Sequence, residues 1–160
     1  MGKRQWMLVL AVLTAQLCSH SFGSAQGRFP GVGSKSEWLK ANGFYAEGNI
    51  AKEGRDYDKA IAKYREAIAI YGADFHYHYN LALALKLSGQ TEIAAQSFRK
   101  ATQLNPRDWK SWKGLGNCLY KLADYKGAAH AFRVALSCGA PASESGELRK
   151  GVAAAVARAH

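Results

Sequence analysis

The residues best suited to metal or redox chemistry are the run His76-Tyr77-His78 and the cysteines Cys118 and Cys138. Side chains two residues apart on a helix point in different directions, so the two histidines could not readily share one ion. The cysteines have no third or fourth ligand close to them in the sequence, and structural zinc is almost always four-coordinate. We therefore expect no metal site, and we expect His78 to pack in the core.

A disulfide between the two cysteines is also disfavoured. If they lie on antiparallel helices joined by a turn near residue 124, they differ by on the order of 12 Å along the helix axis, at ~1.5 Å per residue. A disulfide needs Cα atoms roughly 4.4–6.8 Å apart. We expect two free, largely buried thiols.

Motifs typical of enzymes are missing from the sequence. It has no nucleophile elbow, no phosphate-binding loop and no HExxH zinc motif. Gly114-Leu-Gly116 lies within a predicted helix, so this glycine pair is not a phosphate cradle. We predict a protein that is not an enzyme and that uses no cofactor, metal or small-molecule substrate.

A pattern of small and aromatic residues returns every 34 residues. The aligned positions are Ala60, Ala94 and Ala128; Tyr64, Phe98 and Phe132; Ala67, Ala101 and Ala135; and, upstream, Gly48, Ala82 and Gly116. Within each unit the alanine, ring and alanine fall at i, i+4 and i+7, which places them on one face of a helix. The upstream small residues mark where a first helix crosses its partner closely. The spacing predicts three units, 41–74, 75–108 and 109–142, of two helices each.

A unit of 34 residues with this pattern resembles the tetratricopeptide repeat (TPR) family. The resemblance covers residues 41–142 without a gap, although Glu47 stands where the family has leucine. It implies an all-α fold in which three helix-turn-helix units stack into a right-handed superhelical solenoid. The first helix of each unit would then line the concave side, and residues 36–40 would lengthen the first of these helices.

The N-terminus predicts an export signal. Residues 1–25 combine Lys3 and Arg4 with the apolar run Met7–Leu13 and small residues up to Ala25, which is the layout of a secretory signal peptide. A buried N-terminal helix is the alternative. The interpretation as a signal predicts a periplasmic or extracellular protein, cleaved near Ala25. Residues 26–35 are rich in glycine and predict a flexible lead.

The C-terminus, residues 143–160, predicts one more helix. Leu148, Val152, Ala155 and Val156 share one face of it. Such a helix would cover the apolar end of the last unit, which solenoids need for solubility. The alternative is an amphipathic tail that binds a partner.

The positions predicted to face the groove are polar, aromatic or cationic. They are the second, fifth, sixth, ninth and twelfth of each unit and include Asn42, Tyr45, Asn49, Lys52, His76, Tyr79, Asn80, Leu83, Lys86, Lys110, Lys113, Asn117 and Tyr120. None of these side chains is a carboxylate. Asparagine amides offer a peptide backbone a donor and an acceptor, tyrosines offer rigid contact area, and lysines attract carboxylates. We predict a groove for an extended, acidic peptide or a chain terminus; the alternative is that these residues only keep the groove solvated.

Some members of the TPR family, co-chaperones that grip heat-shock-protein tails, hold a C-terminal carboxylate with a clamp of five residues. By position, Asn49, Asn80 and Lys110 match that pattern. Tyr45 stands where the first lysine of the clamp belongs, and Gly114 stands where its arginine belongs. The resemblance therefore implies a partial clamp.

The formal net charge of +10 favours acidic or anionic partners. The sequence thus predicts an adaptor or scaffold that binds another protein through a peptide segment. The alternative is a basic helical repeat protein that binds an anion such as nucleic acid, lipopolysaccharide or a membrane surface. The groove lacks the alternating side chains that read bases in RNA-binding repeats, which disfavours nucleic acid and leaves peripheral membrane contact open. A third class, the small three-unit chaperones of secretion systems, is cytosolic and conflicts with an export signal.

Overall fold

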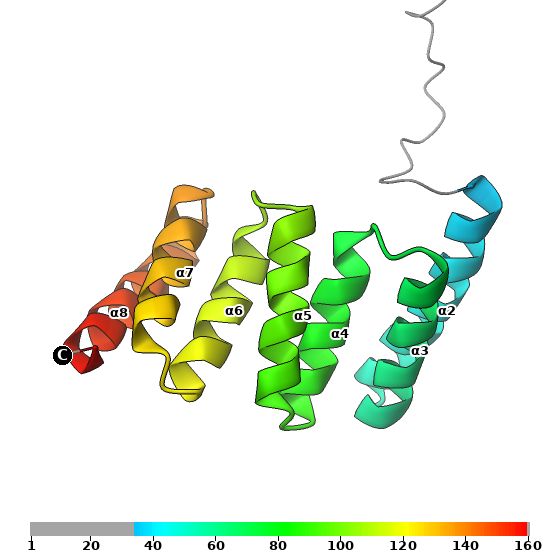
Figure 1. The fold of residues 1–160 in the computed structure, drawn as a ribbon, viewed down its shortest axis with the longest axis horizontal. Helices are drawn as coiled ribbons and strands as arrows, with labels where there is room; N and C mark the ends of the chain where they lie inside the picture. Colours follow the sequence, from blue (N-terminus) through cyan, green and yellow to red (C-terminus); the bar gives the residue numbers. More distant parts are fainter. Residues whose placement is uncertain (1–33, 160) are drawn as a thin grey trace, which may run out of the picture.

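The computed structural model describes residues 34–159, which carry seven α-helices and no strand (Figure 1). The predicted signal peptide and all but the last two residues of the predicted lead lie outside the described residues. The helices are α2 (Lys35–Glu53), α3 (Tyr57–Ile70), α4 (Phe75–Leu87), α5 (Thr91–Leu104), α6 (Trp109–Lys121), α7 (Tyr125–Ser137) and α8 (Ala142–Arg158). No helix in this part of the chain is long and apolar enough to cross a bilayer.

Short polar side chains fix where most of these helices begin. Asp56, Asp74, Asp108 and Asp124 each accept a hydrogen bond from a backbone N–H two or three residues further on. Ser34 does the same at the start of α2, as part of a capping box. Each such cap satisfies a donor that the helix itself leaves unpaired, and losing one typically costs about 1 kcal/mol. Asp74 and Asp108 cap in this way the first helices of the second and third units, α4 and α6.

The core repeats with the sequence, because each second helix inserts one ring between two layers. Tyr64 and Phe98 are fully buried, and Phe132 is 4% exposed. Gly48 lies against the ring of Tyr64, where a Cβ would come within 2.6 Å of Cε1, and Gly116 lies equally close to Phe132. The close crossing that the small residues predicted is therefore real, and it depends on the absence of a side chain.

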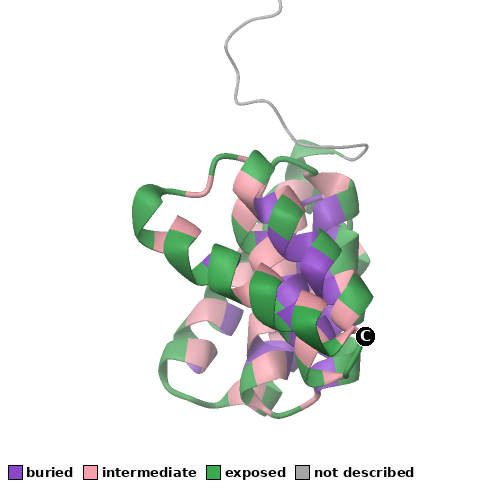
Figure 2. Cartoon of the chain, turned by 90° about the vertical axis from the view of Figure 1, so that its left-hand side faces the viewer, coloured by how far each residue is buried: buried purple, intermediate pink, exposed green. Residues whose placement is uncertain are grey.

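The helices stack in order, each one packing against the next (Figure 1). The first helices also touch across units, α2 with α4 and α4 with α6, so they form one continuous layer. Buried residues gather in the interior between the layers, and exposed residues cover the outer faces (Figure 2). This arrangement confirms the all-α stack of helix-turn-helix units with a C-terminal helix.

Helix α8 continues the repeat rather than simply closing it. It packs against α7 and buries Leu148 and Ala155, as a covering helix should. Residue 143 would be the first of a fourth unit in the same 34-residue phase, so the positions predicted to face the groove correspond here to Glu144, Glu147, Leu148, Gly151 and Ala154. By this count α8 takes the place of the first helix of a unit, as α2, α4 and α6 do.

Candidate peptide-binding groove

A hydrogen-bonded network joins α2 to α4 at the N-terminal end of the groove. The Asn80 Nδ2 group donates to Tyr45 Oη at 2.8 Å and to the His76 carbonyl oxygen at 3.0 Å. The Lys52 ammonium donates to Asn80 Oδ1 at 2.7 Å. Asn80 is only 8% exposed, so its amide serves the protein's own structure.

Two further asparagines of α2 are held in place by tyrosines from the core. The Tyr64 hydroxyl donates to Asn49 Oδ1 at 2.8 Å, and the Tyr77 hydroxyl donates to Asn42 Oδ1 at 2.9 Å. Burial raises the pKa of Tyr64, and it raises the pKa of Tyr77 to about 12, so both phenols stay protonated donors at neutral pH. The two asparagines are thus oriented by the core and do not rotate freely.

Tyr45 packs its ring against two other tyrosines, with centroids 5.8 Å from Tyr64 and 5.0 Å from Tyr77. Tyr79 meets the edge of Phe98 at 5.9 Å. Ring pairs at such distances stabilise by about 0.5–1.5 kcal/mol beyond their buried area. The wall of the groove is therefore rigid as well as polar.

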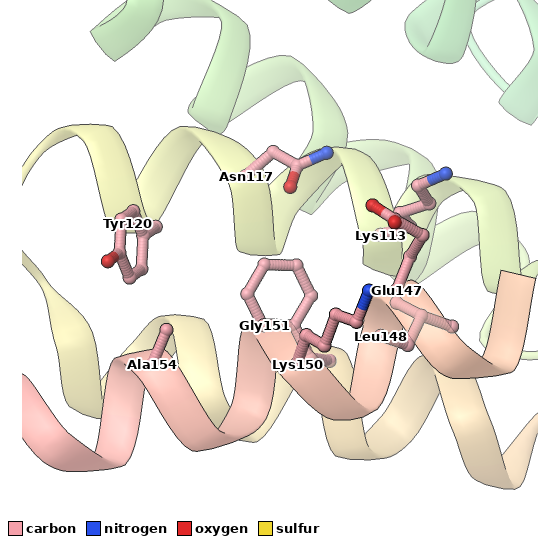
Figure 3. Close-up of a pocket in the computed structure, with 9 residues that line it drawn as sticks. Lys113, Asn117, Tyr120, Glu147, Leu148, Lys150, Gly151 and Ala154 are labelled. Carbon is pink, nitrogen blue, oxygen red and sulfur yellow. The ribbon is translucent and has the colours of Figure 1, made fainter.

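The C-terminal half of the groove contains two hollows. A smaller one of about 320 Å³ lies between α4 and α6 and includes Tyr79, Leu83, Lys86 and Lys110 in its lining. A larger one of about 530 Å³ lies between α6 and α8 (Figure 3). Lys113 and Asn117 of α6 line both, so the two hollows are neighbours along one face.

The sequence missed the contribution of α8 to this face. Glu144 forms an ion pair with Lys113 and lines the smaller hollow, while Glu147, Gly151 and Ala154 line the larger one. The groove therefore does carry carboxylates, unlike the positions predicted for the three units. The signal was available, because extending the 34-residue phase by one more helix places these residues in register with the groove positions.

Two of the five clamp positions hold residues that pack. Gly114 is buried beneath Phe98, and any side chain there would collide with that ring, so an arginine could not take its place. Tyr45 is held by Asn80 and by its neighbouring rings. Lys110 is exposed, with its ammonium 5.9 Å from the ring centroid of Trp109. The cationic part of a five-residue clamp is thus reduced to one lysine.

The histidines and cysteines have structural surroundings. His78 is 9% exposed and hydrogen-bonded through Nε2 to the Gly72 carbonyl oxygen at 3.0 Å, and burial lowers its pKa. Cys118 is buried and Cys138 half-buried, both as free thiols. Across residues 34–159, no group of three or more His, Cys, Asp or Glu side chains could hold a metal ion.

Comparison with known proteins gives a family and its relatives. The sequence model of the tetratricopeptide repeat matches residues 45–87 and 79–144. The heat-shock protein cognate (HSC) co-chaperone sgt12 of Aspergillus fumigatus is 41% identical over 87 residues, which are 54% of this chain and 26% of that protein. The small glutamine-rich tetratricopeptide repeat-containing protein 2 of Mycosarcoma maydis is 31% identical over 121 residues, 76% of this chain and 34% of that protein. The chain thus spans about a quarter to a third of the length of these relatives.

These relatives overturn the prediction of export. The likeness to an HSC co-chaperone and to a second protein of its kind contradicts the prediction of a periplasmic or extracellular protein. The prediction rested on residues 1–25, which lie outside both the described residues and the match to the family. A positively charged start followed by an apolar run describes a signal peptide, but it also describes other apolar N-terminal segments, and this pattern alone did not separate them.

The fold also indicates a relationship to TPR proteins. The crystal structure of the Sgt2 TPR domain from Aspergillus fumigatus superimposes with a TM-score of 0.67 at 30% sequence identity, covering 79% of this chain and 85% of that domain. The family match spans more than half of the chain, its helices stack as the repeat requires, and its small and aromatic residues meet where the repeat places them. The chain therefore belongs to the tetratricopeptide repeat family.

Proposed function

We propose that this protein is a non-enzymatic adaptor that binds an extended, net-acidic peptide segment or chain terminus along the face of α2, α4, α6 and α8. The observation that carries the proposal is the pair of neighbouring hollows, which together are lined by Lys86, Lys110, Lys113 and Lys150. Among the described residues, only Lys113 of these four has an ion-pair partner. Three ammonium groups thus remain to attract carboxylates of a ligand.

The rigid polar wall at the other end of the groove supports the same proposal. Asn42 and Asn49 are oriented by core tyrosines, and an oriented amide binds a peptide backbone with less loss of entropy than a mobile one. The likeness to an HSC co-chaperone supports a protein partner, since co-chaperones work through contact with other proteins. It gives no support to an anion-binding protein that recognises nucleic acid or a membrane surface.

Because the clamp is only partial, we propose that the groove recognises acidic side chains along the peptide more than a terminal carboxylate. Asn80 is hydrogen-bonded inside the protein and Gly114 lies beneath a ring, so a terminal carboxylate would meet few of the groups that a full clamp provides. Recognition then depends on acidic side chains spread along the peptide and on the lysines of α4, α6 and α8. A peptide terminus would bind through the same charges.

The test is a selection of phage-displayed random dodecapeptides on the full chain at physiological ionic strength. We expect the selected peptides to be rich in aspartate and glutamate. Their affinity, measured by fluorescence anisotropy, should fall about fivefold or more in Lys110→Ala, as for loss of one charge contact. Lys100→Ala removes a lysine of α5 that is also exposed but lies outside the groove, and this variant should bind like the parent.

Two outcomes would contradict the proposal. Selected peptides without excess acidic residues would remove the charge argument, and equal affinities of the two alanine variants would place the binding site outside the groove. Binding that falls steeply with salt and shows no peptide preference would instead favour the anion-binding alternative.

A further inference from the structure

The larger hollow, between α6 and α8, combines a firm apolar floor with a polar rim. Its floor includes Phe132 and Leu148, and Leu148 is only 2% exposed. Gly151 lies so close to Phe132 that a Cβ there would come 3.0 Å from Cε2 of the ring, so α8 already touches this floor. The hollow is therefore bounded by tightly packed residues and does not arise from loose packing of the last helix.

Small residues on α8 keep the hollow open. Gly151 and Ala154 stand at positions that face the groove, and Ala154 points towards α6 (Figure 3). The volume of about 530 Å³ falls within the roughly 300–1,000 Å³ of typical ligand pockets. A side chain of a bound peptide could thus enter between the two helices and contact the apolar residues that line the hollow.

The rim carries groups that suit an acidic peptide. Lys113, Asn117 and Tyr120 project from α6, and Lys150 projects from α8 (Figure 3). Glu147 is the one carboxylate in the lining of this hollow, and Glu144 lies beside it in the ion pair with Lys113. The lysines of the two hollows outnumber these two carboxylates, so the surroundings favour a peptide of net negative charge.

We infer that the hollow between α6 and α8 is an anchor site for one bulky apolar side chain, such as leucine, methionine or phenylalanine, from the acidic peptide that the groove binds. The inference rests on the proposed function and names the side chain that gives it specificity. Peptide interfaces commonly concentrate their binding energy in a few buried apolar anchors, with polar groups around them. None of the groove residues predicted from the sequence lies on α8, so this site was not visible from them.

A variant pair on α8 tests the anchor site. Ala154→Phe fills the hollow, whereas Ala153→Phe places the same ring on the neighbouring residue, which is also exposed but does not line the hollow. Ala154→Met serves as a second, smaller filling variant. Circular dichroism melts should show that all three variants fold like the parent.

The ligand is the tightest acidic dodecapeptide from the phage selection, labelled with fluorescein, together with a version in which its bulky apolar residue is alanine. We expect the alanine version to bind the parent chain and Ala153→Phe about tenfold more weakly, as for loss of one buried leucine-sized side chain. In Ala154→Phe and Ala154→Met the affinity for the original peptide should fall by a similar factor, and the alanine version should then bind nearly as well as the original.

The outcomes separate this inference from the proposed function. If the selected peptides are acidic but carry no recurrent apolar residue, or if the peptide's alanine substitution costs the same factor in Ala154→Phe as in the parent, the anchor site is wrong while the groove stands. If Lys110→Ala also leaves the binding unchanged, both the groove and the anchor site are wrong.

Discussion

Replacing Gly116 with alanine adds a single methyl group at one of the close crossings in the core. The new Cβ would lie 2.5 Å from Cε1 of Phe132, so ring and helix must separate by about 1 Å to reach ordinary contact. The ring has little room to retreat, because Gly151 of α8 lies against its other edge. Overpacking of this kind costs about 1–3 kcal/mol, and the upper part of that range, about 2–3 kcal/mol, applies here because the ring cannot retreat.

The same substitution also brings a gain that has to be subtracted. Alanine is a better helix former than glycine by about 1 kcal/mol in a helix interior. We therefore expect Gly116→Ala to lower the free energy of unfolding by about 1–2 kcal/mol. For a domain of this size the melting temperature should fall by about 3–6 °C.

Gly43 provides the matched control, since it also lies inside a helix but an added Cβ there would have no neighbour within 4 Å. Gly43→Ala should raise the free energy of unfolding by about 0.5–1 kcal/mol, through helix propensity alone. Urea unfolding followed by circular dichroism measures both variants. Equal effects of the two substitutions, or a Gly116→Ala chain as stable as the parent, would refute the packing assigned to the repeat.

Three further predictions concern stability. Burial raises the pKa of Tyr77 from its ordinary 10 to about 12, so the protonated phenol stabilises the fold fully below pH 10, and this contribution should be lost as the pH rises from 10 towards 12. Urea titrations at a series of pH values should therefore show less alkaline destabilisation for Tyr77→Phe than for the parent, and an unchanged pH profile would contradict this. Asn80→Ala removes the partner of Lys52 and should lower the free energy of unfolding by about 1–3 kcal/mol, whereas a loss confined to peptide affinity would show that the amide faces the ligand. Asp108→Ala removes the helix cap that accepts from the Ser111 N–H and should cost about 1 kcal/mol by the same unfolding assay, while Asp108→Asn, which can still cap, should cost much less.

The stack of helices could be predicted from the sequence because its packing requires small and aromatic residues at regular positions. A ring such as Phe98 must meet small residues on the neighbouring helices, and this requirement recurs with every unit, so the spacing of 34 residues carries the fold. The N-cap hydrogen bonds of Asp74 and Asp108 are also local, because each joins residues at most three positions apart. Structural features that depend on one unit alone, or that recur in every unit, can therefore be predicted from the sequence.

The groove could be predicted only in part, because the sixth position of a unit can be either buried or exposed. Asn80 and Gly114 were assigned to the groove, yet both are buried, and Leu148 at the same position of α8 is buried too. In the first unit Ala46 is exposed, since no earlier described unit covers it. Burial at this position thus depends on the preceding unit, and this relationship between units is not written in the unit itself.

The sequence predicted that helix α8 packs on the last unit, but it did not predict the contribution of α8 to the groove. Its apolar face predicted contact with the last unit, and Leu148 makes that contact. The ion pair between Glu144 and Lys113, and the hollow beside Ala154, depend on the angle at which α8 crosses α7. Only the assembled structure gives that angle.

The hydrogen bonds between α2 and α4 have a consequence for how the units are aligned. The burial of apolar surface is non-directional, so by itself it does not fix how far one helix is shifted along its neighbour. The Asn80 amide of α4 removes that freedom, because it meets Tyr45 and Lys52 of α2 in one relative position only. The first unit of the solenoid is thus held in register with the second by directional hydrogen bonds between α2 and α4.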